Sequence, residues 1–126
     1  GPPHSHLSAG QPGDPKKPAR VVEVVMREAD GKMMFVPNRI EVRHGEQIRF
    51  VIRNAGELEH EFVLATKEEN RKHAEEMRST STTSASAAAK KVGEIVWRFT
   101  KRGVFEFGCL IPGHYEAGMF GTVIVK

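Results

Sequence analysis

The sequence predicts an all-β protein, an antiparallel Greek-key β-sandwich of seven or eight strands with one short helix in an insertion. Short runs of β-branched and aromatic residues recur along the chain, each bounded by glycine, proline, asparagine or aspartate. Only residues 67–78 have the composition of a helix. Short strands at regular spacing, separated by turn signals, are typical of a sandwich.

Residues 1–19 are predicted to form a flexible arm ahead of a folded domain at residues 20–126. The arm holds five prolines and three glycines and has almost no large apolar side chain, so it cannot bury enough surface to offset the entropy of ordering. Its Gly1-Pro2 start resembles the remnant of a cleaved expression tag. The arm also carries His4 and His6, which are more simply interpreted as solvated residues than as a weak cupric or nickel site.

The first part of the domain contains four predicted strands. The run Val21–Met26 is β-branched and compact, as a strand buried on much of both faces would be. Asp30-Gly31 and Pro37-Asn38 are turn signals. Later segments alternate apolar with charged residues, the pattern of a strand with one face in water. The four strands are expected at residues 21–26, 33–36, 40–43 and 47–53.

A fifth strand, residues 58–64, carries His60 and leads into an insertion at about residues 67–91. The insertion begins with the predicted helix, in which acidic residues lie three and four positions before Lys72. A stretch rich in serine, threonine and alanine follows and is expected to be a mobile loop. The last three strands are expected at residues 94–99, 103–107 and 121–125.

The composition excludes several classes of protein. With 126 residues, 39% of them hydrophobic and 28% charged, the chain suits one globular domain. One cysteine cannot form an internal disulfide or supply the thiolates of a zinc finger. The net charge of +3 comes without the basic runs of a nucleic-acid-binding protein, and no segment is long and apolar enough to cross a membrane.

The single cysteine, Cys109, begins a loop that also carries His114 and Met119. Thiolate, imidazole and thioether donors thus fall within eleven residues, between two predicted strands that fix the ends of the loop. Proline and glycine residues within the loop permit a tight path that turns the three donors inward. Taken singly, a cysteine or a methionine is usually a core residue, but together in one shaped loop these residues indicate a metal site.

Two histidines and one cysteine with a weak axial methionine make a blue-copper electron-transfer site, so a second imidazole is needed. His60 is the favoured candidate because it lies in a predicted strand. The competitors are His44, in a predicted turn, and His73, on a predicted polar helix. The apolar residues of the loop are expected to form a docking patch around His114; they are Leu110, Ile111, Pro112, Tyr115 and Phe120.

Two segments, residues 54–64 and 109–121, resemble the copper-binding segments of the cupredoxins, the type 1 copper proteins. The Cys-x4-His-x4-Met spacing and the final Gly-Met-Phe-Gly most resemble rusticyanin. The run Gly93–Phe99 and the His60-Glu61 pair also resemble periplasmic cupredoxins associated with copper tolerance and respiratory oxidases. The resemblance covers about residues 20–126. It implies one copper ion per chain, cycling between the cuprous and cupric states, with His60, Cys109, His114 and Met119 as its ligands.

The sequence departs from the cupredoxin pattern at Glu61, where many members have asparagine or serine linking the two copper loops. A carboxylate that points inward would favour cupric copper and lower the reduction potential, whereas one that points outward would be a surface acid. The insertion holds only His73 and Met77 as possible donors, which argues against a second copper site there.

The resemblance implies an electron carrier rather than an enzyme, transferring single electrons between redox partners in the bacterial periplasm. A c-type cytochrome or a terminal oxidase would be such a partner, and the carrier is expected to be a monomer. The alternative is a periplasmic copper-tolerance protein that binds or oxidises cuprous ion. A detached multicopper oxidase or nitrite reductase domain would need further histidine pairs inside the fold, and thiol redox chemistry would need a second cysteine.

Overall fold

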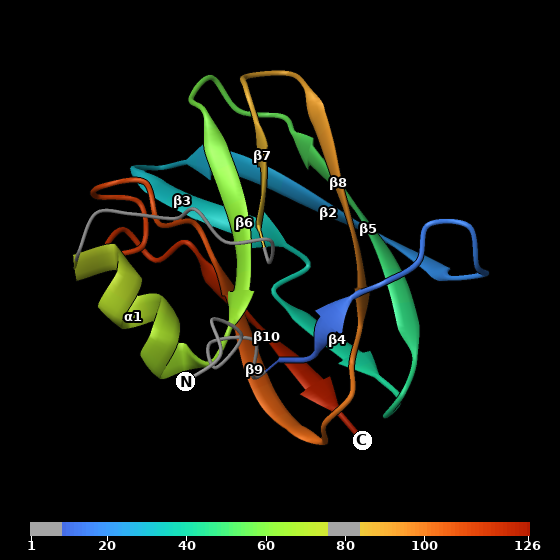
Figure 1. Cartoon of the computed structure of the whole chain (residues 1–126). Coiled ribbons are helices and arrows are strands. Elements are labelled where there is room, and N and C mark those ends of the chain that lie inside the picture. Colours follow the sequence, from blue (N-terminus) through green and yellow to red (C-terminus); the bar gives the residue numbers. More distant parts are fainter. Residues whose placement is uncertain (1–8, 76–83) are drawn as a thin grey trace.

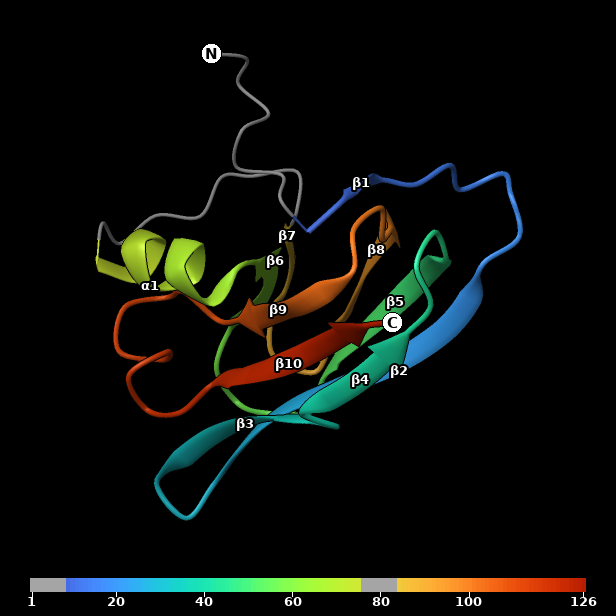
Figure 2. The same cartoon turned by 90° about the horizontal axis from the view of Figure 1, so that it is seen from below.

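Two five-stranded sheets face each other in the computed structural model, which describes residues 9–75 and 84–126 (Figures 1 and 2). The first sheet has the strand order β1-β8-β5-β2-β3 and the second β4-β10-β9-β6-β7. Within the described residues the elements are β1 (Gln11–Pro12), β2 (Arg20–Ala29), β3 (Lys32–Val36), β4 (Arg39–Val42), β5 (Gln47–Asn54), β6 (His60–Ala65), α1 (Lys67–Glu75), β7 (Ser84–Ala87), β8 (Val92–Arg98), β9 (Gly103–Gly108) and β10 (Phe120–Val125). The predicted fold class, a Greek-key sandwich with one short helix, is confirmed.

The turn between β2 and β3 has the conformation that its sequence predicts. Asp30 and Gly31 both have positive φ, 53° and 76°, and Ala29 pairs directly with Lys32. A two-residue hairpin loop needs positive φ at both positions, which Asp-Gly adopts at low cost. This hairpin fixes the register of β2, the strand that carries Glu28.

The pairing of the strands differs from the wholly antiparallel sandwich that was predicted. Strand β2 pairs in parallel with β5, and β4 pairs in parallel with β10. After β3 the chain crosses to the second sheet as β4 and returns as β5, which therefore runs in the same direction as β2. Alternation of apolar and polar residues identifies a strand but does not determine the direction of its neighbour.

The predicted arm also differs from the structure over residues 9–19. Strand β1 pairs antiparallel with β8 and forms the edge of the sheet, and Ala9 is fully buried. The carbonyl of Ala9 accepts a hydrogen bond of 3.1 Å from the indole Nε1 of Trp97. Residues from Ala9 onward therefore belong to the folded domain, while His4 and His6 lie outside the described residues.

The insertion likewise holds more regular structure than predicted. Helix α1 starts with a capping box, in which the Glu69 amide donates to Thr66 Oγ1 and the Thr66 amide donates to Glu69 Oε1. Residues 84–87 of the predicted mobile loop instead form β7, which pairs with β6. Residues 76–83 lie outside the described part of the chain. Alanine and serine have little strand preference of their own, so it is the open edge of β6 that provides this pairing.

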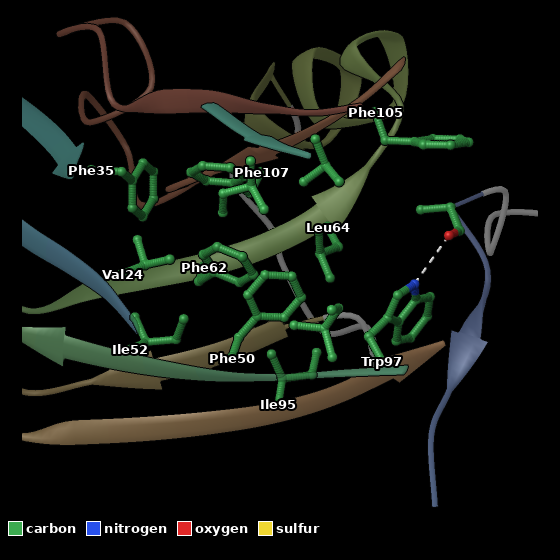
Figure 3. Packing of buried hydrophobic residues seen from close by; sticks show 14 of the residues in the cluster. Val24, Phe35, Phe50, Ile52, Phe62, Leu64, Ile95, Trp97, Phe105 and Phe107 are labelled. Carbon is green, nitrogen blue, oxygen red and sulfur yellow. Dashed lines mark hydrogen bonds between the residues drawn. The ribbon is translucent and has the colours of Figure 1, made fainter. Parts of the chain in front are cut away.

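The space between the sheets is filled mainly by aromatic side chains (Figure 3). Phe62 stacks on Phe107 with ring centroids 4.9 Å apart, and Phe35 meets both rings edge-on. Trp97 is fully buried at one end of this core, where Figure 3 shows its hydrogen bond to the N-terminal segment. The rigid core holds the ends of β6 and β9, from which the candidate site is built.

Helix α1 lies outside the sandwich, against β6 and β9 (Figures 1 and 2). It is close to the loop that joins β9 to β10, drawn in orange and red in both views. At nine residues and with mostly charged side chains, it is too short and too polar to cross a membrane, and no other helix occurs in the described residues.

Candidate metal site

Three of the four predicted ligands converge at one end of the sandwich. The Nδ1 atoms of His60 and His114 are 3.2 Å apart, and Cys109 Sγ lies 3.9 Å from the first and 3.4 Å from the second. All three residues are buried. Within residues 9–75 and 84–126, this is the group of histidine, cysteine and acidic donors whose ligand atoms come close enough to hold a metal ion.

The spacing of these atoms fits one metal ion. Imidazole nitrogen and thiolate sulfur bind a first-row metal ion at about 2.0 Å and 2.3 Å respectively. One ion can therefore contact atoms that lie between 3.2 and 3.9 Å from one another. A thiolate with two imidazoles is the donor set of a type 1 copper site.

The loop between β9 and β10 is held closed at its base by main-chain hydrogen bonds. The Cys109 amide donates to the Met119 carbonyl at 3.1 Å, and the Met119 amide donates to the His114 carbonyl at 3.2 Å. Gly113 and Gly118 have φ of 88° and 98°, the left-handed region that favours glycine. The predicted tight path is thus present, and it turns Cys109 and His114 toward the same point.

Met119, the fourth predicted ligand, is fully buried at the end of this loop. Its main chain is tied to Cys109 and His114 by the hydrogen bonds just described. A buried methionine whose main chain is tied to two of the donor residues remains the candidate for a weak axial ligand, and that role stays a prediction.

Of the two competing histidines, His44 does not join the cluster. His44 is exposed, and its Nε2 lies 2.9 Å from the carbonyl of Thr100. His73 falls within α1, as predicted, rather than at the end of the sandwich where β6 begins. His60 is the first residue of β6, not a mid-strand residue, and it is completely buried. The choice of His60 as the second imidazole is consistent with this placement.

The side chain of Glu61 points toward the Cys109 loop rather than away from it. Its Oε1 accepts a hydrogen bond of 3.2 Å from the Leu110 amide, and its own amide lies 3.4 Å from Cys109 Sγ as a donor. Glu61 therefore links the two segments that carry the ligands. The inward orientation, which the sequence left open, is the one the structure adopts.

Glu28 also belongs to the site, although no motif in the sequence marks it as a site residue. Its Oε2 lies 2.6 Å from Nε2 of His60, on the side of the ring opposite to Nδ1. Its Oε1 accepts the amide of Glu57 at 2.9 Å. Burial acts to raise the pKa of Glu28, but the hydrogen bonds from Glu57 and His60 outweigh it, and the pKa of this carboxyl is lowered overall.

Asn54 shapes the turn that leads to His60. Its side-chain amide donates to the carbonyls of Leu58 and Ala87 at 2.6 and 3.0 Å, while its Oδ1 accepts the Gly56 amide at 2.9 Å. This fully buried side chain connects the end of β5 with the turn after it and with the edge strand β7. The resemblance to cupredoxins included this asparagine, and the structure gives it a physical role.

Burial shifts the pKa values of two of the three donors, Cys109 and His114. Burial raises the pKa of the Cys109 thiol to about 11, partly offset by the amides of Glu61 and Ile111. Burial also lowers the pKa of His114, and the nearby His60 acts in the same direction. The ring of His114 is therefore neutral near pH 7, as a metal ligand must be, whereas the thiol has to lose a proton when a metal binds.

A buried polar cluster supports the loop from the side of α1. The hydroxyl of Tyr115 donates to Glu106 Oε1 at 2.8 Å, and the Asn70 side-chain amide lies 3.4 Å from the same oxygen. Glu106 is only 5% exposed, and its burial raises the pKa of its carboxyl. These contacts connect α1, β9 and the loop between β9 and β10 through Asn70, Glu106 and Tyr115, the residue after His114.

The predicted docking patch is smaller than expected. Leu110 is buried against Val63 and Tyr115 and is not available at the surface. Pro112 and Phe120 are exposed, and Ile111 and Tyr115 are half-buried. His114 itself is only 8% exposed, so little of this residue is accessible beside them.

The profile of the family described as copper binding proteins, plastocyanin/azurin family, matches residues 22–126. The chain belongs to this family. Its resemblance to the cupredoxins is therefore confirmed, and one copper ion fits the cluster of His60, Cys109 and His114.

Two bacterial proteins are similar to this chain over most of their length. The copper-resistant cuproprotein CopI of Rubrivivax gelatinosus is 50% identical over 123 residues, which are 93% of this chain and 73% of that protein. The protein of the same name from Pseudomonas aeruginosa is 34% identical over 152 residues, 93% of this chain and 82% of that protein. Reduced auracyanin from Roseiflexus castenholzii shares the fold, with a TM-score of 0.73 at 18% identity over 86% of this chain and 98% of that one.

Proposed function

We propose that this copper-binding protein serves copper tolerance in the bacterial periplasm, holding one copper ion with His60, Cys109 and His114 and with Met119 as the axial ligand. The observation that carries the proposal is the convergence of two imidazoles and one thiol, all buried, at 3.2 to 3.9 Å. The names of the two relatives, both copper-resistant cuproproteins, support a role in tolerance.

A copper ion in this site supplies a one-electron couple between its cuprous and cupric states. The thiol and thioether donors favour the cuprous state, and the imidazoles accommodate both. The chain contributes a closed loop and a buried donor set, which exclude water and change little in position when an electron leaves. The electron has to pass to a redox protein, for which a c-type cytochrome or a terminal oxidase is proposed, and no bond in a substrate is made or broken.

The absorption spectrum of the copper-loaded protein tests the site. An intense visible band from the thiolate is expected in the cupric form, and it should disappear on reduction. Cys109→Ser should bind copper weakly and without colour. A colourless copper-loaded wild-type protein would rule out the type 1 site.

Electron transfer between respiratory partners is the second candidate function. It is favoured by the exposed and half-buried apolar residues of the loop that carries His114, which suit brief contact with another protein. A strain that lacks the protein separates the two functions. Copper sensitivity with normal respiration supports tolerance, whereas slowed respiration at low copper supports electron transfer. Complementation with Cys109→Ser shows whether either effect depends on the metal site.

A further inference from the structure

Glu28 lies on the first sheet, yet its carboxylate reaches the ligand His60 on the second. Strand β2 places Glu28 two residues before the Asp30-Gly31 turn, opposite Met33 of β3. The distance of 2.6 Å between Oε2 and Nε2 of His60 is short even for a charge-assisted hydrogen bond. His60 is completely buried, and the side chain of Glu28 is 24% exposed. The contact is therefore largely screened from water by the protein.

Both oxygens of the Glu28 carboxylate are engaged as acceptors. Oε1 accepts the Glu57 amide at 2.9 Å, while Oε2 faces the ring of His60. A carboxylate can only accept, so the proton of a neutral His60 ring lies on Nε2. Nδ1 is then left with its lone pair, and this is the atom that faces Cys109 Sγ and His114 Nδ1.

The space for this carboxylate depends on a glycine. A Cβ built on Gly56 would lie 1.9 Å from Glu28 Oε2 and 2.7 Å from its Cδ, and no positive φ accounts for glycine at this position. Gly56 is itself fixed, because its amide donates to Asn54 Oδ1. The turn between β5 and β6 is therefore shaped to admit the Glu28 carboxylate beside His60.

We propose that Glu28 is a positioning residue for the copper site: it selects the ring tautomer of His60 and, through the ring, stabilises the cupric state over the cuprous state. The inference rests on the proposed function, since it concerns the same metal. A negative charge on the far side of the imidazole makes Nδ1 a stronger donor, which benefits the more highly charged ion more. Glu61 is the second carboxylate of the site. It accepts the Leu110 amide, whereas Glu28 contacts the ring of His60.

The test compares Glu28→Ala and Glu28→Gln with wild type and with Glu23→Gln. Glu23 lies on the same strand, is exposed, and pairs with Arg53, so its substitution removes one charge without touching His60. The cupric and cuprous affinities and the reduction potential of the copper-loaded proteins are measured. Glu28→Ala should lower cupric affinity by about 10- to 100-fold and cuprous affinity less. Each factor of ten by which the loss of cupric affinity exceeds the loss of cuprous affinity raises the reduction potential by about 59 mV.

Gly56→Ala is an independent variant because it leaves every ionisable residue in place. Its methyl group should displace the carboxylate and raise the potential in the same direction as Glu28→Ala. Equal losses of cupric and cuprous affinity in the Glu28 variants, with a potential that matches Glu23→Gln, would overturn the proposal and reduce Glu28 to a structural role.

The metal-free protein provides a readout that does not depend on copper. Nitrogen chemical shifts of the His60 ring should show the proton on Nε2 in wild type and a mixture of tautomers in Glu28→Ala. If wild type does not bind copper, the proposed function fails, and these shifts still decide whether Glu28 sets the tautomer. A wild-type ring protonated on Nδ1 would overturn the proposal whatever the copper result.

Discussion

The main-chain amide of Glu61 lies 3.4 Å from the sulfur of Cys109, and the carboxylate of the same residue accepts the amide that follows the cysteine. Glu61 thus holds the loop that begins at Cys109 by two contacts, and one of them is made by its charged carboxylate. Asparagine or serine at this place would provide the link without the charge. The glutamate therefore combines a structural link with an electrostatic influence, and the two can be separated experimentally.

Glu61→Gln and Glu61→Ala should behave differently. Gln keeps an oxygen that can accept the Leu110 amide but removes the charge, so the reduction potential should rise while stability changes little. Ala removes both, so the free energy of unfolding of the metal-free protein should also fall, by about 1 kcal/mol. Voltammetry and urea unfolding measure the two effects, with the exposed neighbour Glu59→Gln as the control. A potential in Glu61→Gln equal to that of wild type would contradict the electrostatic part.

Copper binding should release about one proton near neutral pH. The pKa of about 11 means that the thiol of Cys109 is protonated in the metal-free protein, and the metal binds the thiolate. Apparent affinity should therefore rise by about tenfold per pH unit between about pH 7.5 and pH 9, where His114, with its lowered pKa, is already neutral. Calorimetry in buffers of different ionisation enthalpy counts the protons. Binding without proton release would mean that Cys109 is already a thiolate.

Met119→Gln should lower the reduction potential. An amide oxygen is a harder and stronger axial donor than a thioether, so it favours the cupric ion, and the visible spectrum should change with it. Met119→Leu removes the donor and should shift the potential upward. A potential that stays the same in both variants would remove Met119 from the ligand set, while His60, Cys109 and His114 would remain.

Glu106→Gln should increase the free energy of unfolding relative to wild type more at neutral pH than in acid. Because the pKa of Glu106 is raised by burial, the folded state prefers the protonated carboxyl. The stability that this preference gives is fully present below the unfolded-state pKa of about 4.3 and is lost as the pH rises through the higher folded-state pKa. The neutral glutamine avoids that loss and preserves the contact with Tyr115.

Urea unfolding of the metal-free protein checks this at about pH 4 and about pH 7. The free energy of unfolding of Glu106→Gln relative to wild type should be more favourable at the higher pH. The exposed Glu68→Gln is the matched control. A relative stability that does not depend on pH would show that the pKa of Glu106 is the same in the folded and unfolded states.

The loop between β9 and β10 could be predicted from the sequence because its candidate ligands and its turn residues lie close together in the chain. Cys109, His114 and Met119 lie within eleven residues, and proline and glycine signal the tight turns that bring them together. His60 could be selected because it lies in a predicted strand, whereas its closeness to the loop in space cannot be read from the local sequence. Runs of β-branched and aromatic residues bounded by turn signals also identified the longer strands.

Glu28 could not be predicted because its role arises from non-local pairing. Nothing near it in the sequence indicates that β2 passes beside the turn before His60. Strands β1 and β7 were missed for a related reason. They consist of glutamine, proline, serine and alanine, and they exist because β8 and β6 offer open edges with unpaired main-chain groups.

The short strand β1 has a consequence for the behaviour of the protein in solution. Strand β8 is paired with β5 on one side, and on the other its only cover in the described residues is the segment around Gln11 and Pro12. Gly13 extends this cover with a hydrogen bond to the Val96 carbonyl. Trimming the chain to residue 20 would uncover a bare strand and leave the indole of Trp97 without its acceptor. Such a fragment would present a template to which a strand of a second molecule could add, so the proline-containing segment protects the sheet against aggregation.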